Sequence, residues 1–585
     1  MGTGGGGGVE VVIVESVGNQ PFVYATASQR ENVGASQAVR LVGRWATEEA
    51  ADDPGLVVVT AGSGKAIVLA MGDGSKAAAR RLVGAVTLRA AAEGAGVHLA
   101  VSVTSAGAAD LADLRPQEAL LARAHHDLEQ SAFLAPRPAG RWPQMPFLAV
   151  CPVSALPASP PSQGDPAGYA DAGRRLSEMS RAKRRLAPAA RKEMTASVGA
   201  FPHLAELERF FDTSTDDMAH GPEKGALDGG AVSDGGAWPE STALERAERL
   251  RWVGVVHADV NGLGERLSRL AGHVPTGYEP VGERAGAVMA ADGRLMLLAY
   301  LADLADAVER CVQAAWKKAA MSVASGAATG SDGDGEEGRA MLVPVVLAGD
   351  DVTFLAPGDA AIDAAAAFLS AFDEAAGEDP VCGPLGLSVA AGVALVKRSF
   401  PFSVAYGLAG ELCHSAKTRS RRCSMLDFHV LYDSTVTGLE ALRRPLRSPD
   451  LDLTARPYRV GRADWPDPPV SLDVLRAAVG AISAAGDDGE RFMSRATAVA
   501  FADRLRDQPA AWAALDESLA ARPGSIGLRP DGSLLVSAGS GRRATLILDA
   551  LDAEGLLDPI LPSSSAVASE PGAVGGPAST AGEGR

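Results

Sequence analysis

Residues 253–264 read VGVVHADVNGLG, and residues 342–355 read LVPVVLAGDDVTFL. Each is an apolar run of strand length that ends at carboxylates or turns around them, so each predicts a buried β-strand. If the strands that carry Asp259 and the pair Asp350 and Asp351 are neighbours, three carboxylates come together. Like charges at close range repel one another unless a cation lies between them. We therefore expect a hard divalent cation, Mg²⁺ or Mn²⁺, with oxygen ligands, which is the chemistry of nucleotidyl transfer.

The elements around these two runs follow the order β-α-β-β-α-β, which is that of the ferredoxin-like fold. The predicted strands and helices of this repeat cover residues 252–259, 294–319, 341–347, 352–356, 360–376 and 385–396. The same order occurs earlier in the chain, over residues 9–15, 36–50, 56–60, 66–71, 75–93 and 97–104. We predict an α+β protein with two related, palm-like (GGDEF-like) domains and a helical C-terminal region.

The chain of 585 residues is too long for one core, and composition suggests where it divides. The segments are a Gly-rich start (1–8), a first palm-like domain without metal carboxylates (9–110), a helical and loop linker (111–249), the second palm domain (250–435), a mainly helical domain (436–562) and a low-complexity tail (563–585). Stretches 156–168, 213–240 and 325–338 are rich in Pro, Gly or Ser and predict loops.

Charge and apolar patterning exclude several protein classes. The formal charge of −17 argues against a general nucleic-acid coat, because phosphate contacts need clustered Lys and Arg. The sequence has no apolar run of membrane-spanning length and no signal peptide, so we expect a cytoplasmic protein without a membrane partner. Five scattered cysteines form no CxxC pair, which argues against a structural zinc site or a disulfide framework.

Residues near the acidic runs have the chemistry to bind a nucleotide. Asn261 and Gly262 follow Asp259 directly, and glycines at 262 and 349 allow backbone N–H groups to approach phosphate oxygens. Lys417 and Arg421 are four residues apart, so on one helix they would share a face that could neutralise a triphosphate. The alternative is an ordinary turn at Gly349-Asp350-Asp351 and a solvated helix end.

Two other motifs carry weaker signals. The run AGSGK (61–65) lacks the Gly and the Ser or Thr of a phosphate-binding P-loop, and it lies at the hairpin position where the second domain has its aspartates. We infer that the first domain has no metal chemistry, since Glu15 alone makes no cluster. The sequence His125-His126-Asp127 would need further metal ligands to act as a hydrolase, and no matching set is present.

Together these motifs resemble the large polymerase-cyclase subunit of type III CRISPR effectors, and its minimal or stand-alone relatives that lack the HD nuclease domain. The matching stretches are HADVNGLG (257–264), AGDD (348–351), Pro401-Phe402 through Ala416-Lys417, FVYAT (22–26) and RENVGAS (30–36). The usual second Gly before the aspartates is Ala348 here. The resemblance covers roughly residues 9–431.

The resemblance implies a CRISPR-associated, ATP-binding nucleotidyltransferase of antiviral defence that makes cyclic or linear oligoadenylates. Asp259, Asp350 and Asp351 would bind Mg²⁺ or Mn²⁺, and Lys417 would contact the triphosphate of ATP or another NTP. An RNA-guided effector complex or an RNA activator would be the partner. Two alternatives stay open: a catalytically weak nucleotide-binding scaffold subunit of such a complex, and a cyclic dinucleotide synthase that acts as a homodimer.

Overall fold

The computed structural model describes residues 8–134, 145–159, 175–196, 252–326, 342–447, 451–461, 468–483, 535–537 and 543–558, with a few residues between 499 and 508, except 27, 63, 95, 146, 398–399 and 433–437. The chain divides into two compact units, residues 1–444 with 456–469, and residues 445–455 with 470–585. The predicted loops at 213–240 and 325–338 and the tail at 563–585 lie wholly or almost wholly outside the described residues.

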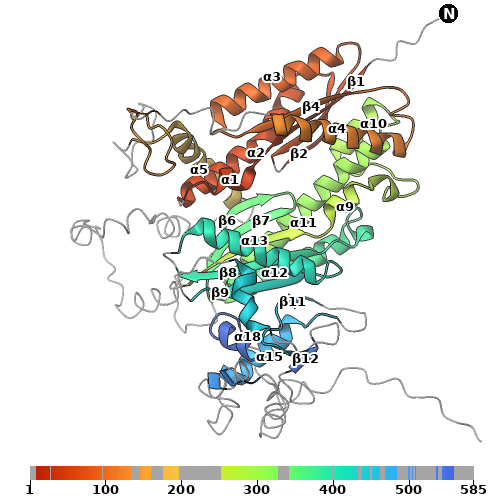
Figure 1. Cartoon of the computed structure of the whole chain (residues 1–585). Helices are drawn as coiled ribbons and strands as arrows, with labels where there is room; N and C mark the ends of the chain where they lie inside the picture. The colour runs from red at the N-terminus through yellow and green to blue at the C-terminus, as the bar shows by residue number, and fades with distance from the viewer. Residues whose placement is uncertain are drawn as a thin grey trace, which may run out of the picture. The chain divides into compact units, whose positions relative to one another are not determined.

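The first module spans residues 9–106 and is a four-stranded antiparallel sheet with the order β2-β3-β1-β4. Its elements are β1 (Val9–Ser16), α1 (Asn19–Val23), α2 (Gln29–Ala51), β2 (Leu56–Gly62), β3 (Lys65–Met71), α3 (Ser75–Glu93) and β4 (Leu99–Ala106). This strand order is that of a ferredoxin-like sheet, so the predicted fold is confirmed here. Figure 1 shows the module in red to orange.

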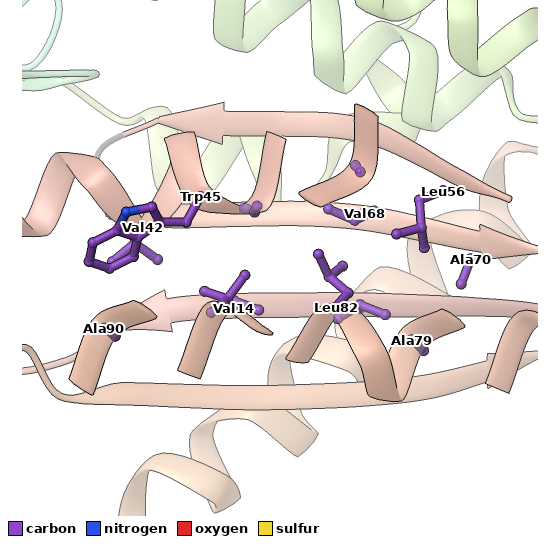
Figure 2. Packing of buried hydrophobic residues seen from close by; sticks show 14 of the residues in the cluster. Val14, Val42, Trp45, Leu56, Val68, Ala70, Ala79, Leu82 and Ala90 are labelled. Carbon is purple, nitrogen blue, oxygen red and sulfur yellow. The ribbon is translucent and has the colours of Figure 1, made fainter. Parts of the chain in front are cut away.

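Strand β1 is buried on both faces, which explains its unbroken apolar sequence. Val12 and Val14 lie in a core formed with α2 and α3, whereas Val11 and Ile13 point to the opposite face and are also buried. Figure 2 shows the first of these faces, where Trp45 of α2 and Leu82 of α3 pack over the sheet. The opposite face contacts α4 (Leu114–Leu134), a helix that lies in the segment predicted as a linker.

The second module spans residues 252–430 and repeats this arrangement within a six-stranded sheet of order β11-β9-β8-β5-β7-β6. Its strands are β5 (Trp252–Val260), β6 (Val343–Ala348), β7 (Asp351–Pro357), β8 (Val389–Lys397) and β9 (Met425–Val430), and β11 (Tyr458–Arg459) adds an edge. Its helices are α9 (Leu263–Leu267), α10 (Glu283–Ala291), α11 (Met296–Gly326), α12 (Ala361–Glu378) and α13 (Phe402–Arg419). The core order β8-β5-β7-β6 matches that of the first module, so the predicted repeat is confirmed. The sequence reading missed β9, which pairs in parallel with β8.

Helices cover both faces of the second sheet. One face packs on α12, where Phe354 of β7 contacts Phe368 and also Trp316 of α11. The other face packs on α13, whose Tyr406 and Leu412 share a core cluster with Val253 and Val255 of β5. Because side chains alternate along a strand, the odd-numbered residues of β5 from 253 to 259 all face α13. This face carries the candidate site.

The two modules contact each other within the first compact unit, because α2 touches β6 and β2 touches α10 and α11. The helix α5 (Glu178–Ala196), predicted as a basic helix at 174–192, packs along α2. Gly34 of α2 allows this approach, since a Cβ there would lie 1.7 Å from the carbonyl oxygen of Lys183.

The second compact unit contains, in its described residues, helices and a small sheet rather than helices alone. Its main helices are α15 (Leu472–Ser483) and α18 (Ile547–Ala553), which contact each other. The sheet has the order β10-β13-β12, from β10 (Leu451–Asp452), β12 (Leu535–Ser537) and β13 (Arg543–Thr545). Across all described helices, none combines the length and the apolar character needed to cross a lipid bilayer.

Candidate functional site

The strand register brings two of the predicted carboxylates together. Strands β5 and β7 are antiparallel neighbours, and Asp259 lies directly opposite Asp351. Residues opposite one another in an antiparallel pair have Cβ atoms about 4.5–5.5 Å apart, with both side chains on one face. Here that face is the one that α13 covers. In the sequence, a long helix and a hairpin separate these two aspartates. The fold brings them side by side.

The third carboxylate lies in the hairpin turn between β6 and β7. Ala348 pairs with Asp351, so Gly349 and Asp350 form a two-residue turn. Gly349 has φ +59°, a left-handed conformation that glycine adopts without a Cβ penalty. The carbonyl oxygen of Asp350 accepts a hydrogen bond from the Val260 amide at 3.3 Å. This bond ties the turn to the end of β5 and keeps Asp350 beside the other two acids.

Helix α13 supplies a cation to the acid pair. The Lys417 ammonium forms an ion pair with the Asp259 carboxylate, and their side chains are 18 % and 35 % exposed. The helix lies close to the sheet because β8 has a glycine beneath it: a Cβ at Gly392 would lie 2.1 Å from the Ala409 carbonyl oxygen. Lys417 therefore reaches the acids, as predicted for a basic residue of the site, and it forms an ion pair with one of them.

The mutual repulsion of the acids appears in their pKa values. Burial, with the negative charges of Asp259 and Asp350, raises the pKa of Asp351 to about 7. Burial and the charge of Asp259 also raise the pKa of Asp350. The side chain of Asp351 is 42 % exposed, yet its Oδ1 atom is buried and makes no hydrogen bond with the described residues. One oxygen of this carboxylate thus faces the interior while the rest of the group is open to solvent.

A buried histidine stands behind Asp351. The Nδ1 atom of His257 lies 3.3 Å from Asp351 Oδ1 and 3.2 Å from the Thr353 hydroxyl. Burial lowers the pKa of His257 to about 4, so the imidazole is neutral near pH 7 and carries one N–H. Cys413 is also near the acids, but burial raises the pKa of its thiol to about 12, and the thiol donates to the Ala390 carbonyl oxygen at 3.3 Å. A protonated thiol is no metal ligand.

Hydrogen bonds of Asn261 and Arg266 hold the turn that follows Asp259. Asn261 is 1 % exposed, and its side-chain amide donates to the Ser388 hydroxyl at 3.0 Å. Gly262 has φ +69° and precedes the five-residue helix α9. The Arg266 guanidinium donates to the carbonyl oxygens of Asn261 at 3.1 Å and Leu385 at 2.9 Å. The structure thus gives Asn261 a structural bond, and its predicted contact with a nucleotide stays a prediction.

The expectation that Lys417 and Arg421 share a helix face is wrong. Helix α13 ends at Arg419, and Ser420 is extended with φ −159° and ψ 139°. Arg421 therefore leaves the helix axis; its side chain is exposed, and its carbonyl oxygen accepts from the Ser388 hydroxyl at 3.2 Å. Its role in nucleotide binding stays a prediction.

The same strand positions in the first module hold a different pair. Glu15 of β1 lies opposite Lys65 of β3, and their side chains form an ion pair at 2.7 Å. The neighbouring His125 donates from Nδ1 to the Leu121 carbonyl oxygen, 2.8 Å away, and Asp127 accepts from the Thr104 hydroxyl at 2.7 Å. These groups are engaged in structural contacts.

Oxygen donors of this kind suit a hard divalent cation, although no three Asp, Glu, His or Cys side chains within the described ranges are spaced to hold one as they stand. The pair Asp259 and Asp351, with Asp350 in the adjoining turn, has the excess negative charge that Mg²⁺ or Mn²⁺ offsets. The buried, unpartnered Oδ1 of Asp351 shows a carboxylate whose bonds are incomplete. The residues present fit such an ion, and its binding stays a prediction. All five cysteines are buried free thiols.

The sequence reading missed His257, Thr353, Tyr406 and Tyr24 at this site. His257 precedes Asp259 by two positions, so strand alternation alone places it on the same face. Thr353 follows from the same alternation, two residues after Asp351. Tyr24 and Tyr406 lie in two of the stretches that carry the resemblance, but no local pattern shows that they meet, because only the packing of distant segments brings them near.

Neither a protein-family model nor a curated protein sequence matches this chain. Solved structures do match. The crystal structure of a Csm1-Csm4 cassette in complex with cA4 aligns with a TM-score of 0.39 and 13 % identity, over 71 % of this chain and 54 % of that chain. The apo Csm1-Csm4 cassette aligns with a TM-score of 0.39 and 13 % identity, over 71 % of this chain and 53 % of that chain.

A third match is the Csm1-Csm4 subcomplex in the type III-A CRISPR-Csm interference complex, with a TM-score of 0.37 and 13 % identity, over 71 % of this chain and 54 % of that chain. These three neighbours are Csm1-Csm4 structures, the last from a type III-A CRISPR-Csm interference complex, and the chain spans about half the length of the chains that it matches.

Proposed function

We propose that this protein is a metal-dependent, palm-type nucleotidyltransferase that joins ATP into cyclic or linear oligoadenylates for antiviral defence signalling. The observation that supports it is the placement of Asp259 opposite Asp351 on two central strands, with Asp350 in the adjoining turn and Lys417 against Asp259. ATP as the substrate, and an RNA-guided complex or RNA activator as the partner, rest on the resemblance of the motifs to type III CRISPR cyclase subunits.

Asp259 and Asp351 would hold Mg²⁺ or Mn²⁺ with help from Asp350. When bound, the ion favours loss of the proton from the attacking ribose hydroxyl and offsets the negative charge of the pyrophosphate that leaves. The hydroxyl oxygen would form a bond to the α-phosphorus of the next nucleotide as the bond to pyrophosphate breaks, and the hydroxyl proton would pass to solvent. The aspartates fix the position of this exchange, because they are on adjacent strands whose hydrogen bonds are internal to the sheet.

Lys417 has a second task in this proposal. Its ammonium is paired with Asp259, where it partly balances the acid cluster. Exchange of this partner for phosphate oxygens would let Lys417 neutralise the triphosphate. The glycine at 349 keeps the turn above the acids free of a side chain, so a nucleotide can approach the backbone there.

The test is incubation of the purified protein with each of the four labelled NTPs and Mn²⁺, with and without candidate RNA activators. We expect release of pyrophosphate and oligomeric products from ATP, and loss of both in an Asp350→Ala/Asp351→Ala variant. A preference for GTP with a dimeric product would favour the cyclic dinucleotide synthase. No product from any NTP under any of these conditions would count against the enzyme.

A nucleotide-binding scaffold is the second candidate. Lys417 already forms an ion pair with Asp259, and in the part of the chain that the structure describes no three side chains are spaced to hold a metal ion. Such a scaffold would bind ATP in the presence of Mn²⁺ without turnover. The Asp350→Ala/Asp351→Ala variant would still assemble into an RNA-guided complex under this alternative.

A further inference from the structure

Tyr24 of the first module belongs to the cores of both modules. It follows α1 directly and packs against a first-module cluster that contains Val23 and Val39. It also packs against the second-module cluster on the α13 face. Its ring centroid lies 3.8 Å from that of Tyr406 and 5.6 Å from that of Phe402, both on α13. One side chain of the first module therefore fills space beside the candidate site of the second.

Two buried polar side chains hold the segment that carries Tyr24. The Lys183 ammonium of α5, on a residue that is 1 % exposed, donates to the Phe22 carbonyl oxygen and lies 4.2 Å from the Phe22 ring centroid. Asn32 is fully buried, and its amide nitrogen, when oriented to donate, reaches the Val23 carbonyl oxygen at 2.7 Å. Burial of a lysine ammonium lowers the stability of the fold unless its hydrogen bonds are made. Its use here indicates that the position of this segment matters.

The contact continues from Tyr406 to the acids. The ring of His257 meets that of Tyr406 edge to face, with centroids 5.4 Å apart. The Nδ1 atom of His257 lies 3.3 Å from Asp351 Oδ1 and 3.2 Å from the Thr353 hydroxyl. His257 is 7 % exposed, and its contact with the Tyr406 ring and its hydrogen bond with Thr353 restrict its orientation. A packed line of three side chains thus runs from Tyr24 to the interior oxygen of Asp351.

We propose that Tyr24 is a positioning residue for Asp351, acting through Tyr406 and His257, so that the first module completes the cation site of the second. His257, whose Nδ1 atom lies 3.3 Å from the interior oxygen of Asp351, packs behind that oxygen and leaves the other oxygen turned outward. Groups that orient a metal-binding carboxylate support the binding of the metal, and loss of such support costs about 10- to 100-fold in metal affinity or activity. This inference rests on the proposed function, because it assumes that Asp351 binds a cation.

The experiment measures Mn²⁺ affinity directly, from the loss of the electron paramagnetic resonance signal of free Mn²⁺ on titration into the full chain. We expect Tyr24→Ala to weaken binding about tenfold. Tyr24→Leu removes the ring but keeps apolar volume, and it should weaken Mn²⁺ binding by a similar factor. It replaces Tyr24→Ala if that variant does not fold. Tyr24→Phe restores the ring and should bind within about twofold of wild type, since the Tyr24 hydroxyl makes no hydrogen bond of normal geometry. His257→Asn keeps an N–H donor near the Nδ1 position and should bind better than His257→Ala.

The matched control is Leu82→Ala, in the core that α2 and α3 form over the first sheet (Figure 2). It should lower the melting temperature without changing Mn²⁺ affinity. Equal Mn²⁺ affinity in wild type and both Tyr24→Ala and Tyr24→Leu overturns the inference while the proposed function stands. A loss in Leu82→Ala as large as in Tyr24→Ala also overturns it, because the effect is then general destabilisation. No Mn²⁺ binding by wild type, with or without ATP, overturns both.

Discussion

The first module places Glu15 opposite Lys65, whereas the second places Asp259 opposite Asp351, at the same step of the same strand pairing. In both cases the last residue but one of the first strand meets the first residue of the third. The first pair is a neutral ion pair, and the second is a pair of like charges, which destabilises a sheet when nothing offsets it. Both modules share this strand pairing, so a difference in chemistry at this step comes from these side chains.

The covering helices show the same contrast. Helix α4 follows β4 and contacts the first sheet as α13 follows β8 and contacts the second. Near Lys65, α4 presents His125, whose pKa is lowered by burial and by the lysine charge. Near Asp259, α13 presents Lys417. The first module thus pairs its charged groups with one another, whereas the second module keeps an excess of negative charge.

The largest expected effect comes from giving the second module the charges of the first. Asp351→Lys places a cation opposite Asp259, so the two should pair and leave no site for a divalent ion. We expect oligonucleotide formation from ATP to fall by about a thousandfold or more, equivalent to about 4 kcal/mol of lost transition-state stabilisation. Product formation at a saturating Mn²⁺ concentration measures this. Retention of activity within tenfold would show that Asp351 has no part in the reaction.

A smaller loss is expected when the lysine of α13 is neutralised. Lys417→Met keeps a long apolar side chain but removes the ammonium that pairs with Asp259. We expect product formation to fall about 100-fold, because phosphate charge is then balanced by fewer groups. Lys417→Arg, which keeps the charge, is the control and should lose less. Similar rates for wild type and Lys417→Met would remove Lys417 from the mechanism.

The repulsion in the second module should appear as a pH dependence of stability in the cation-free protein. The pKa of Asp351 is raised to about 7, above its ordinary value of about 3.9. Between these values the folded state holds more protons than the unfolded state, so this group lowers the free energy of unfolding as pH rises. Because the Asp351 side chain is 42 % exposed, solvent screening reduces the effect to about 1 kcal/mol.

Asp351→Asn removes this titration. In buffer with a chelator, the melting temperature of Asp351→Asn should exceed that of wild type at pH 8, and the difference should shrink towards pH 4. A difference that does not change with pH would mean that Asp351 ionises freely in the folded protein.

The smallest effect is expected in the first module. Glu15→Gln breaks an ion pair whose side chains are 34 % and 31 % exposed, so the free energy of unfolding should change by less than about 1 kcal/mol. Product formation from ATP should equal that of wild type. A loss greater than tenfold would give the first module a carboxylate with a role in the reaction.

Much of the framework was predictable because periodicity carries it. The helix at 75–93 and the strands β1, β5 and β7 were predicted to within one residue, since apolar runs and turn residues bracket them. The sequence also predicted that Asp259 would come close to Asp350 and Asp351 if their strands were neighbours, but the register that places Asp351 opposite Asp259 came only from the structure. The predicted start of α2 was seven residues late, because its first turn carries Arg30, Glu31 and Asn32, which are buried by tertiary contacts.

The rest depended on contacts between distant segments. Nothing local shows that α13 stops at Arg419, and this stop separates Arg421 from Lys417. Helix α4 falls in the segment predicted as a helical and loop linker, and the structure shows that its buried face packs on the first sheet. Tyr24 and Tyr406 are 382 positions apart in the sequence, so only the packed structure could reveal their contact.

The position of β5 inside the sheet has a consequence for experiment. Its amides and carbonyls are bonded on both sides, to β7 and to β8. Such a strand exchanges its amide hydrogens for deuterium only when a large part of the sheet opens. Local breathing of loops cannot separate Asp259 from Asp351, so the strain between them is present in every folded molecule. Deuterium uptake by β5 and β7 should therefore slow when a cation relieves that strain.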